Sequence, residues 1–315
     1  MTLAVSRMDA APIAHICPHG YSNRHHAAVN LPACGCPNIL NCNITIEALA
    51  VKSMFSKLHD PLIKKLKLVE EGQQHTLLEE LRDIKTPTTL GFLNQHGYNI
   101  VQHDKTARRN FSRINYLLRD GIGVKLACKL NGLEPGANLN GTDFIPQLVE
   151  YLLASEQGGR FQPFVLGTCE PWTTRGASAL FAEHAFHALD GFQQNDDYLH
   201  FIQRHLQPGK TPLIIMGMGM PRQEEVAAHL QRQLEGPALM VCGGAIIDFA
   251  AQRFNRAPVA VRKVGMEWLY RLLMEPRRLF KRYIIGIPQF FYFVLRNGTD
   301  RRVRISEQSV YERKS

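Results

Sequence analysis

From about residue 63 onward, the sequence alternates short apolar segments with longer segments of helical periodicity. The apolar segments read as buried strands, because they are brief, rich in aliphatic residues and followed by glycine or polar residues. We expect these strands at 66–69, 88–94, 116–124, 161–167, 211–219 and 238–244. We expect helices in the stretches between them, ending near 81, beginning near 104, and at 144–154, 172–187, 195–206 and 223–234. This alternation predicts an α/β fold with a mostly parallel, Rossmann-like sheet and helices on both faces.

Glycine and polar residues collect at the carboxyl ends of the predicted strand segments. They are Asn94, Asp120, Gly121, Gly167, Gly217, Gly219, Gly243 and Gly244. In an open α/β sheet the carboxyl ends of the strands form the crevice in which ligands bind. We therefore expect the functional site at that edge of the sheet.

The segment GMGMPRQE (217–224) reads as a glycine-rich turn from a strand into a helix. Gly217 and Gly219 would let the backbone approach a ligand closely, and the free N–H groups of the new helix would attract an anion. The segment lacks the third glycine of a dinucleotide-binding fingerprint and the Gly-Lys-Ser/Thr of a P-loop, which disfavours both kinds of site. Gln223 and Glu224 then place one amide and one carboxylate in a first helical turn that we expect to face the crevice.

In the segment RDGIGV (119–124), Asp120 stands at the end of the apolar part of a predicted strand and is followed by two glycines. A carboxylate there suits a general base, an acceptor for a sugar hydroxyl, or a side chain that only holds a tight turn. No Ser-His-Asp order, HExxH or Asp-x-Asp pair lies near the strand ends, which disfavours a hydrolase, a zinc protease and a metal-dependent sugar-nucleotide enzyme. His96 and His103 read as structural or surface residues.

The positive charge of the chain is unevenly placed. There are 37 Lys and Arg residues against 28 Asp and Glu, a net charge of +9, but residues 251–315 hold 15 of the bases and only five of the acids. Within this segment, residues 265–297 mix cations with aromatic and aliphatic residues, a pattern suited to a membrane interface. A helix docked on the sheet with a solvated basic face is the alternative. The apolar run 283–295 is shorter than the roughly 20 residues of a spanning helix.

The N-terminus and the cysteines bear on location and on metal binding. The start of the chain lacks the apolar region of a secretory signal, and the seven cysteines are an odd number, so we expect free thiols in the cytosol. Residues 1–62 read as a poorly ordered leader with incidental Cys and His. A zinc site is the alternative, although the spacing of Cys34 and Cys36 is not that of a structural zinc clip.

The expected organisation is the leader 1–62, an α/β domain 63–258, a basic amphipathic appendage 259–300 and a basic tail 301–315.

Seven motifs occur in an order that carries a resemblance to a known family. They are DGIGV (120–124), NGTDF (140–144), DGF (190–192), GMGMPRQE (217–224), CGGAIIDF (242–249), RAP (256–258) and EWLYRLLMEPRR (267–278). Over about residues 65–290 the chain resembles the WecG/TagA/CpsF family, bacterial glycosyltransferases that act on lipid-linked sugars.

The resemblance implies an inverting, metal-independent transfer of a sugar from a UDP donor to an undecaprenyl-diphosphate-linked acceptor. The sugar would be of the N-acetylmannosamine or glucose type, and the setting would be cell-surface or exopolysaccharide biosynthesis at the cytoplasmic membrane face. The catalytic base of the family falls on Asp120. The substrate-binding positions that the shared motifs imply are Asn94, Gly123, Asp143, Gly217, Gly219, Gln223, Glu224, Asp248, Arg256, Arg271 and Arg278, with Lys281 or Arg282 at a third cationic place.

The chemistry of the residues agrees with this reaction. An inverting transfer needs one base for the acceptor hydroxyl and cations for the departing diphosphate, to which arginine binds with two donors at once. Departures from the family pattern at Phe92, Asn138 and Gln252 leave the donor sugar and the acceptor open. The competing hypothesis is a non-catalytic module that binds membranes or polyanions. Nucleic acid is not expected, because the basic run has no reader motif, and homo-oligomerisation stays open.

Overall fold

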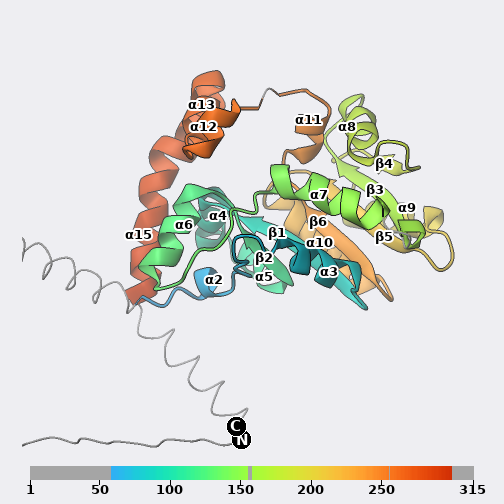
Figure 1. Cartoon of the computed structure of the whole chain (residues 1–315), viewed down its shortest axis with the longest axis horizontal. Coiled ribbons are helices and arrows are strands. Elements are labelled where there is room, and N and C mark those ends of the chain that lie inside the picture. The colour runs from blue at the N-terminus through green and yellow to red at the C-terminus, as the bar shows by residue number, and fades with distance from the viewer. Residues whose placement is uncertain (1–57, 155–157, 255, 300–315) are drawn as a thin grey trace, which may run out of the picture. The chain divides into compact units, whose positions relative to one another are not determined.

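The computed structural model describes residues 58–299 except 155–157 and 255 (Figure 1). The predicted Cys- and His-containing leader, apart from its last five residues, and the basic tail lie outside the described residues. In the part of the chain that is described, no group of three or more His, Cys, Asp or Glu side chains is arranged to hold a metal ion.

Six parallel strands form a sheet with the order β2-β1-β6-β5-β3-β4. The strands are β1 (Pro87–Leu93), β2 (Tyr116–Arg119), β3 (Phe161–Gly167), β4 (His187–Leu189), β5 (Thr211–Gly217) and β6 (Ala238–Cys242). All seven residues of β3 and of β5 are buried, as expected for parallel strands covered on both faces. The predicted α/β fold with a parallel sheet is confirmed.

Helices cover both faces of the sheet, and the alternation of side chains along β5 shows this directly. Leu213 and Ile215 pack into one apolar core, and Ile214 and Met216 pack into another on the opposite face. The first core is covered by α3 (Gln74–Arg82), α7 (Gly141–Ala154), α8 (Trp172–Phe181) and α11 (Ile246–Ala250). The opposite face carries α9 (Asn195–His205) and α10 (Arg222–Gln233), and a third core joins α2 (Pro61–Lys64), α4 (Gln95–His103), α5 (Lys105–Arg113), α6 (Gly121–Leu130) and α15 (Gly286–Thr299).

The structure corrects four of the predicted elements. The strand expected over 116–124 is β2 only as far as Arg119, and α6 begins at Gly121. Residues 66–69 are not a strand, and they make a single backbone hydrogen bond to β2, from Lys67 N to Leu117 O. Residues 95–103 form α4, because the side chain of Asn94 accepts hydrogen bonds from two backbone N–H groups and so caps a helix. The helix predicted over 172–187 ends at Phe181, since Ala182 has a φ of +50°, and the short strand β4 follows.

The basic C-terminal segment divides into a cavity-lining part and a part that belongs to the core. The first part comprises α12 (Val259–Lys263), α13 (Glu267–Met274), α14 (Pro276–Phe280) and the π-helix η2 (Lys281–Ile285). The second part is α15, which lies beside α4 and α6 (Figure 1). Its side chains Phe290 and Val294 are fully buried. Asn99 of α4 also donates a hydrogen bond of 2.7 Å to the carbonyl of Gly286.

None of the helices within the described ranges has the length and apolar character needed to cross a membrane. The apolar residues of the amphipathic pattern in 265–297 must therefore either lie on the surface of the protein or pack in its core. Part of it is explained by core packing, because α15 buries Phe290, Phe293 and Val294. The remainder lies on α13, α14 and η2.

Two substitutions on α15 test this packing. We expect Phe290→Ala to lower the free energy of unfolding by about 3–5 kcal/mol, because it empties a fully buried site in the core. Tyr292 is 60% exposed on the same helix, and Tyr292→Ala should change the free energy of unfolding by no more than about 0.5 kcal/mol. Urea denaturation followed by circular dichroism measures both values, and equal losses would contradict the burial of α15.

Candidate active site

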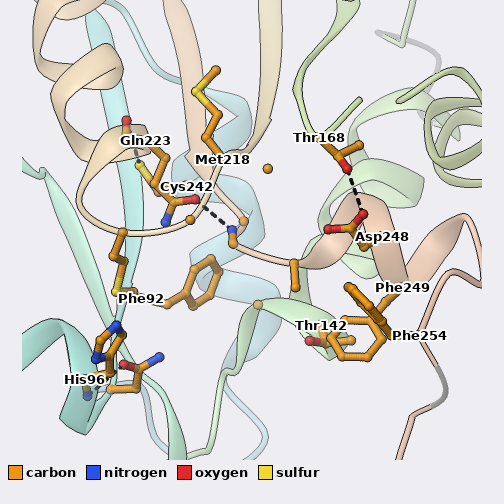
Figure 2. A pocket seen from close by; sticks show the side chains of 18 of the residues that line it. Phe92, His96, Thr142, Thr168, Met218, Gln223, Cys242, Asp248, Phe249 and Phe254 are labelled. Atoms are coloured by element: carbon orange, nitrogen blue, oxygen red, sulfur yellow. Dashed lines mark hydrogen bonds between the residues drawn. The ribbon is translucent and has the colours of Figure 1, made fainter. Parts of the chain in front are cut away.

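The carboxyl ends of the strands border a cavity of about 530 Å³, which we call the strand-end cavity (Figure 2). Its wall comes from segments far apart in the sequence, as predicted for the crevice of an α/β sheet. Among the residues that line it are Phe92, Asn94, His96, Asp120, Thr168, Gly217, Gly219, Gln223, Gly244, Asp248, Arg253, Arg271, Arg278 and Arg282.

Gly217 and Gly219 form part of this wall for steric reasons. A Cβ at Gly217 would lie 2.4 Å from Cδ1 of Ile247, and Gly219 has a φ of +76°, which favours glycine. Both glycines therefore keep the chain close to the cavity as it passes from β5 into α10. The sequence-based placement of these two residues at the crevice agrees with the structure.

Gln223 and Glu224 are both buried at the start of α10, but only Gln223 lines the cavity. The side-chain carbonyl of Gln223 accepts a hydrogen bond of 2.8 Å from the N–H of Gly244 (Figure 2). The side-chain amide of Gln223 donates a hydrogen bond of 2.7 Å to Glu224. The expectation that Glu224 faces the crevice is corrected, because its carboxyl group is turned into the protein behind Gln223. Burial raises the pKa of Glu224 to about 7.

A second cavity of about 330 Å³ lies beside the first, and we call it the helix-lined cavity. Its wall is mainly apolar and comes from α6, α13, η2 and α15. The apolar side chains in that wall are Ile122, Leu126, Trp268, Tyr283, Ile287, Phe290 and Phe291, and the predicted site residue Gly123 is also there. Five residues line both cavities, and we call them the junction residues: Asn94, Asp120, Thr142, Arg271 and Arg282.

Asp120 stands at the N-cap position of α6, but its side chain makes no capping hydrogen bond. Its carboxylate instead accepts a hydrogen bond of 3.3 Å from the amide of Asn94. A side chain that only held the turn would bond to the turn's own backbone, so that interpretation does not describe Asp120. Burial raises the pKa of Asp120, while the Asn94 hydrogen bond and the positive charges of Arg282 and Arg271 oppose the rise. A carboxylate with a raised pKa is the stronger base.

Arg271 and Arg282 are the cationic junction residues. Neither forms an ion pair or a side-chain hydrogen bond within the described part of the chain, and Nε of Arg282 is buried without a partner. The guanidinium of Arg271 lies 5.4 Å from the ring centroid of Phe249. Unpaired cations that border a cavity favour an anionic ligand, because burying a lone charge is costly.

Lys281 and Arg282, the two candidates for the third cationic place, differ in their position relative to the cavities. Lys281 is exposed and lines neither of the two cavities that meet at Asp120, whereas Arg282 lines both. Arg278 also borders the strand-end cavity, but Glu275 accepts two hydrogen bonds from it, of 2.6 and 2.7 Å.

Comparison with known proteins shows which family this chain belongs to. The sequence profile described as "Glycosyl transferase WecG/TagA/CpsF family" matches residues 64–304. This chain belongs to the WecG/TagA/CpsF family. It is therefore a glycosyltransferase, as the resemblance in the sequence predicted.

Curated relatives come from strains of Staphylococcus aureus. The proteins of strains MRSA252 and MW2 are each 26% identical to this chain, over 229 and 228 residues, which are 69% of this chain and 86% of each relative. Both are named N-acetylglucosaminyldiphosphoundecaprenol N-acetyl-beta-D-mannosaminyltransferase.

The remaining predicted site residues of this glycosyltransferase either border the strand-end cavity or lie outside both cavities. Asp248 accepts hydrogen bonds from Thr168, at 2.8 Å, and from Arg253, at 3.1 Å, at the rim of the strand-end cavity (Figure 2). Asp143 lines neither of the two cavities that meet at Asp120. It pairs with Arg256, at 2.7 Å, and with Arg262, at 3.3 Å, which fastens the segment that leads to α12 onto α7. Asp143 and Arg256 are thus placed to support the site rather than to face it.

His96 lines the strand-end cavity in the first turn of α4, although the sequence suggested a structural or surface role. Burial and the nearby charge of Arg282 lower its pKa to about 4, so the imidazole is neutral at physiological pH. The available signal was its position two residues after Asn94, just past the carboxyl end of β1. Other cavity residues to which the sequence gave no role in the site include Thr168, Phe249, Arg253, Phe254 and Trp268. Phe249 and Trp268 stand within two of the shared motifs, but neither side chain carries a group that would mark it as part of a site.

The charge of Arg282 provides a test of this arrangement. We expect the pKa of His96 to rise in Arg282→Gln, because the loss of a nearby positive charge makes the imidazolium form less unfavourable. The rise should be partial, since burial remains. Lys281→Gln is the matched control and should leave the pKa unchanged. NMR titration of the His96 ring carbons measures all three proteins, and a wild-type pKa near 6.5 would show that His96 is not in the buried site described here.

Proposed function

We propose that this glycosyltransferase moves a sugar from a UDP-sugar to a polyprenyl-diphosphate-linked saccharide, with inversion at the anomeric carbon and with Asp120 as the base. The observation that carries the proposal is the junction, where one carboxylate and two unpaired arginines line both cavities. A transfer reaction needs such a place, because the donor carbon and the acceptor hydroxyl must meet beside the base and the cations.

The strand-end cavity suits the donor. Its glycine-rich wall lets a nucleotide lie close to the backbone, and the N-terminal end of α10 favours the negative charge of a diphosphate. Arg271 and Arg282 stand where that diphosphate would meet the junction. Because these two guanidinium groups can stabilise the departing UDP, we propose that the transfer needs no metal cofactor.

The helix-lined cavity suits the acceptor. Its aromatic and aliphatic wall matches the first isoprenoid units of a polyprenyl chain, and it opens to the same arginines that a diphosphate would require. The relatives in Staphylococcus aureus are named for transfer to N-acetylglucosaminyldiphosphoundecaprenol, which supports an undecaprenyl-diphosphate-linked N-acetylglucosamine as the acceptor class. Their names support an N-acetylmannosamine-type sugar, and a glucose-type sugar is the alternative to test beside it.

The proposed reaction is a single displacement. Asp120 accepts the proton of the acceptor hydroxyl as its oxygen forms a bond to the anomeric carbon of the donor sugar. The bond between that carbon and the UDP oxygen breaks at the same time, and the electron pair leaves with UDP. Arg271 and Arg282 stabilise the negative charge that develops on the leaving diphosphate. Attack from the face opposite the leaving group inverts the anomeric configuration.

Exposed apolar side chains on the C-terminal helices support a membrane-bound setting for this reaction. The large apolar side chains exposed there are Leu273, Met274, Phe280, Ile284, Ile285, Tyr292 and Leu295. Arg277 and Lys281 are exposed among them, as in helices that lie at an anionic lipid surface. We propose that this surface rests peripherally on the cytoplasmic face of the membrane and brings the helix-lined cavity to the lipid-linked acceptor, in cell-surface or exopolysaccharide biosynthesis.

Replacement of the proposed base tests the mechanism. We expect Asp120→Asn to lower kcat by about 10²–10⁴-fold, the range that a general base contributes, while calorimetry shows retained UDP binding. The assay is UDP release from UDP-N-acetylmannosamine or UDP-glucose with polyprenyl-diphosphate N-acetylglucosamine as acceptor. Glu183→Gln changes an exposed carboxylate outside the two cavities and should keep full activity. Wild-type turnover by Asp120→Asn would exclude Asp120 as the base.

The membrane surface is tested separately with vesicles that contain phosphatidylglycerol. We expect the double variant Phe280→Asp/Ile284→Asp to bind these vesicles at least about tenfold more weakly, because it removes two exposed apolar contacts and adds like charge. Phe192 is 77% exposed but lies outside the C-terminal helices, so Phe192→Asp is the matched control for binding. Equal vesicle binding by the two variants in a flotation assay would place the membrane contact elsewhere.

A further inference from the structure

We propose that Arg119 and Asn138 are positioning residues that aim the Asp120 carboxylate at the junction. The inference rests on the proposed role of Asp120 as the base and adds to it two side chains that do not themselves exchange the proton. The observation behind it is a set of hydrogen bonds that ties the turn at 119–121 to the loop at 135–138.

We call this set of hydrogen bonds the clamp, and Arg119 forms its inner half. It is the last residue of β2 and only 5% exposed. Its guanidinium group lies among backbone carbonyl groups. Its Nε donates to the carbonyl of Pro135 at 2.9 Å, and Nη2 donates to that of Gly136 at 2.8 Å. Because the buried guanidinium donates hydrogen bonds to two successive carbonyl groups, it fixes the path of the 135–138 loop relative to β2.

The loop is itself held from the other side. The N–H of Ala137 donates to the carbonyl of Val69 at 2.7 Å, and a Cβ on Gly136 would lie 2.2 Å from the same oxygen. Hydrogen bonds therefore hold the loop between Val69 and Arg119, and only glycine fits at residue 136. It offers the 119–121 turn a rigid support.

Asn138 is the outer half of the clamp and acts on the peptide group next to Asp120. Its Oδ1 accepts one hydrogen bond of 3.0 Å from the N–H of Gly121 and one of 3.3 Å from Arg119. The Gly121 N–H belongs to the peptide unit that rotates with ψ of Asp120. On the other side of the residue, the N–H of Asp120 donates to the carbonyl of Leu93 at 2.9 Å. Both peptide units that flank Asp120 are thus held, so its Cα–Cβ bond points in one direction.

The position of Asn138 makes a purely structural role a poor explanation. Its side chain is exposed and lines the helix-lined cavity, so no core packing requires an amide there. Arg119 also belongs to the three cations whose charge favours ionised Asp120, together with Arg271 and Arg282. The clamp therefore controls both the direction of the carboxylate and part of its electrostatic environment.

Substitution of Asn138 is the sharper test, because a change at buried Arg119 risks misfolding. We expect Asn138→Ala to lower kcat about five- to twentyfold at saturating donor and acceptor, since a small misplacement of a reacting group is costly. UDP affinity and the melting temperature should stay near wild-type values. Asn138→Asp keeps an acceptor for the Gly121 N–H and for Arg119, and should recover most of kcat at high pH. Glu134→Ala, an exposed change just before the clamped loop, is the control.

The pH profile separates positioning from mere folding support. The added negative charge of Asn138→Asp disfavours ionised Asp120, so the acid limb of the kcat/KM profile should move to higher pH than in the wild type. In Asn138→Ala the limb should stay in place while the plateau falls. If Asn138→Ala keeps wild-type kcat, or changes only the KM of the acceptor, the positioning role is excluded. Loss of activity in Asp120→Asn together with an unchanged Asn138→Ala would reject this inference alone, whereas an active Asp120→Asn would reject the proposed base itself.

Discussion

Two arginine side chains, Arg271 and Arg282, border the active site without a direct ion pair to a carboxylate in the described part of the chain, and the packing around them must offset that cost. Arg253, Arg256, Arg262 and Arg278 each pair with an acidic side chain, whereas Arg271 and Arg282 do not within the described residues. Partly buried, uncompensated cations destabilise a fold unless other contacts offset the cost. Their retention beside Asp120 is most simply explained by a ligand that brings negative charge.

The offsetting contacts come from α15, which follows the π-helix that carries Arg282. Its apolar face is buried against α4, and Asn297 donates a 2.9 Å hydrogen bond to the hydroxyl of Tyr98, which in turn donates to the buried carboxylate of Asp60. A helix anchored in this way can hold a cation in an unfavourable place near its start. The packing of the third core and the electrostatics of the site are therefore parts of one arrangement, even though they involve opposite ends of the described chain.

The sequence predicted the parallel sheet well because buried strands such as 161–167 leave a clear apolar pattern, and it placed Asp120 and the crevice because strand ends converge. It missed α4, since Asn94 and Gly97 look like a turn until the Asn94 side chain is seen to cap a helix. It assigned Glu224 to the crevice because residues 223 and 224 share a helical turn, while only three-dimensional packing decides which one faces inward. The roles of His96 and Asn138 depend on contacts between segments that no local pattern records.

The meeting of two cavities at one carboxylate also limits how the substrates of the proposed reaction can bind. A diphosphate on the donor and a diphosphate on the acceptor would both approach Arg271 and Arg282, and two such groups carry more negative charge than two arginines neutralise. Arg278 could supply a third positive charge, because it borders the strand-end cavity and its only ionic partner in the described structure is Glu275. Glu275 lines the same cavity, so an incoming diphosphate would compete with it for the Arg278 guanidinium.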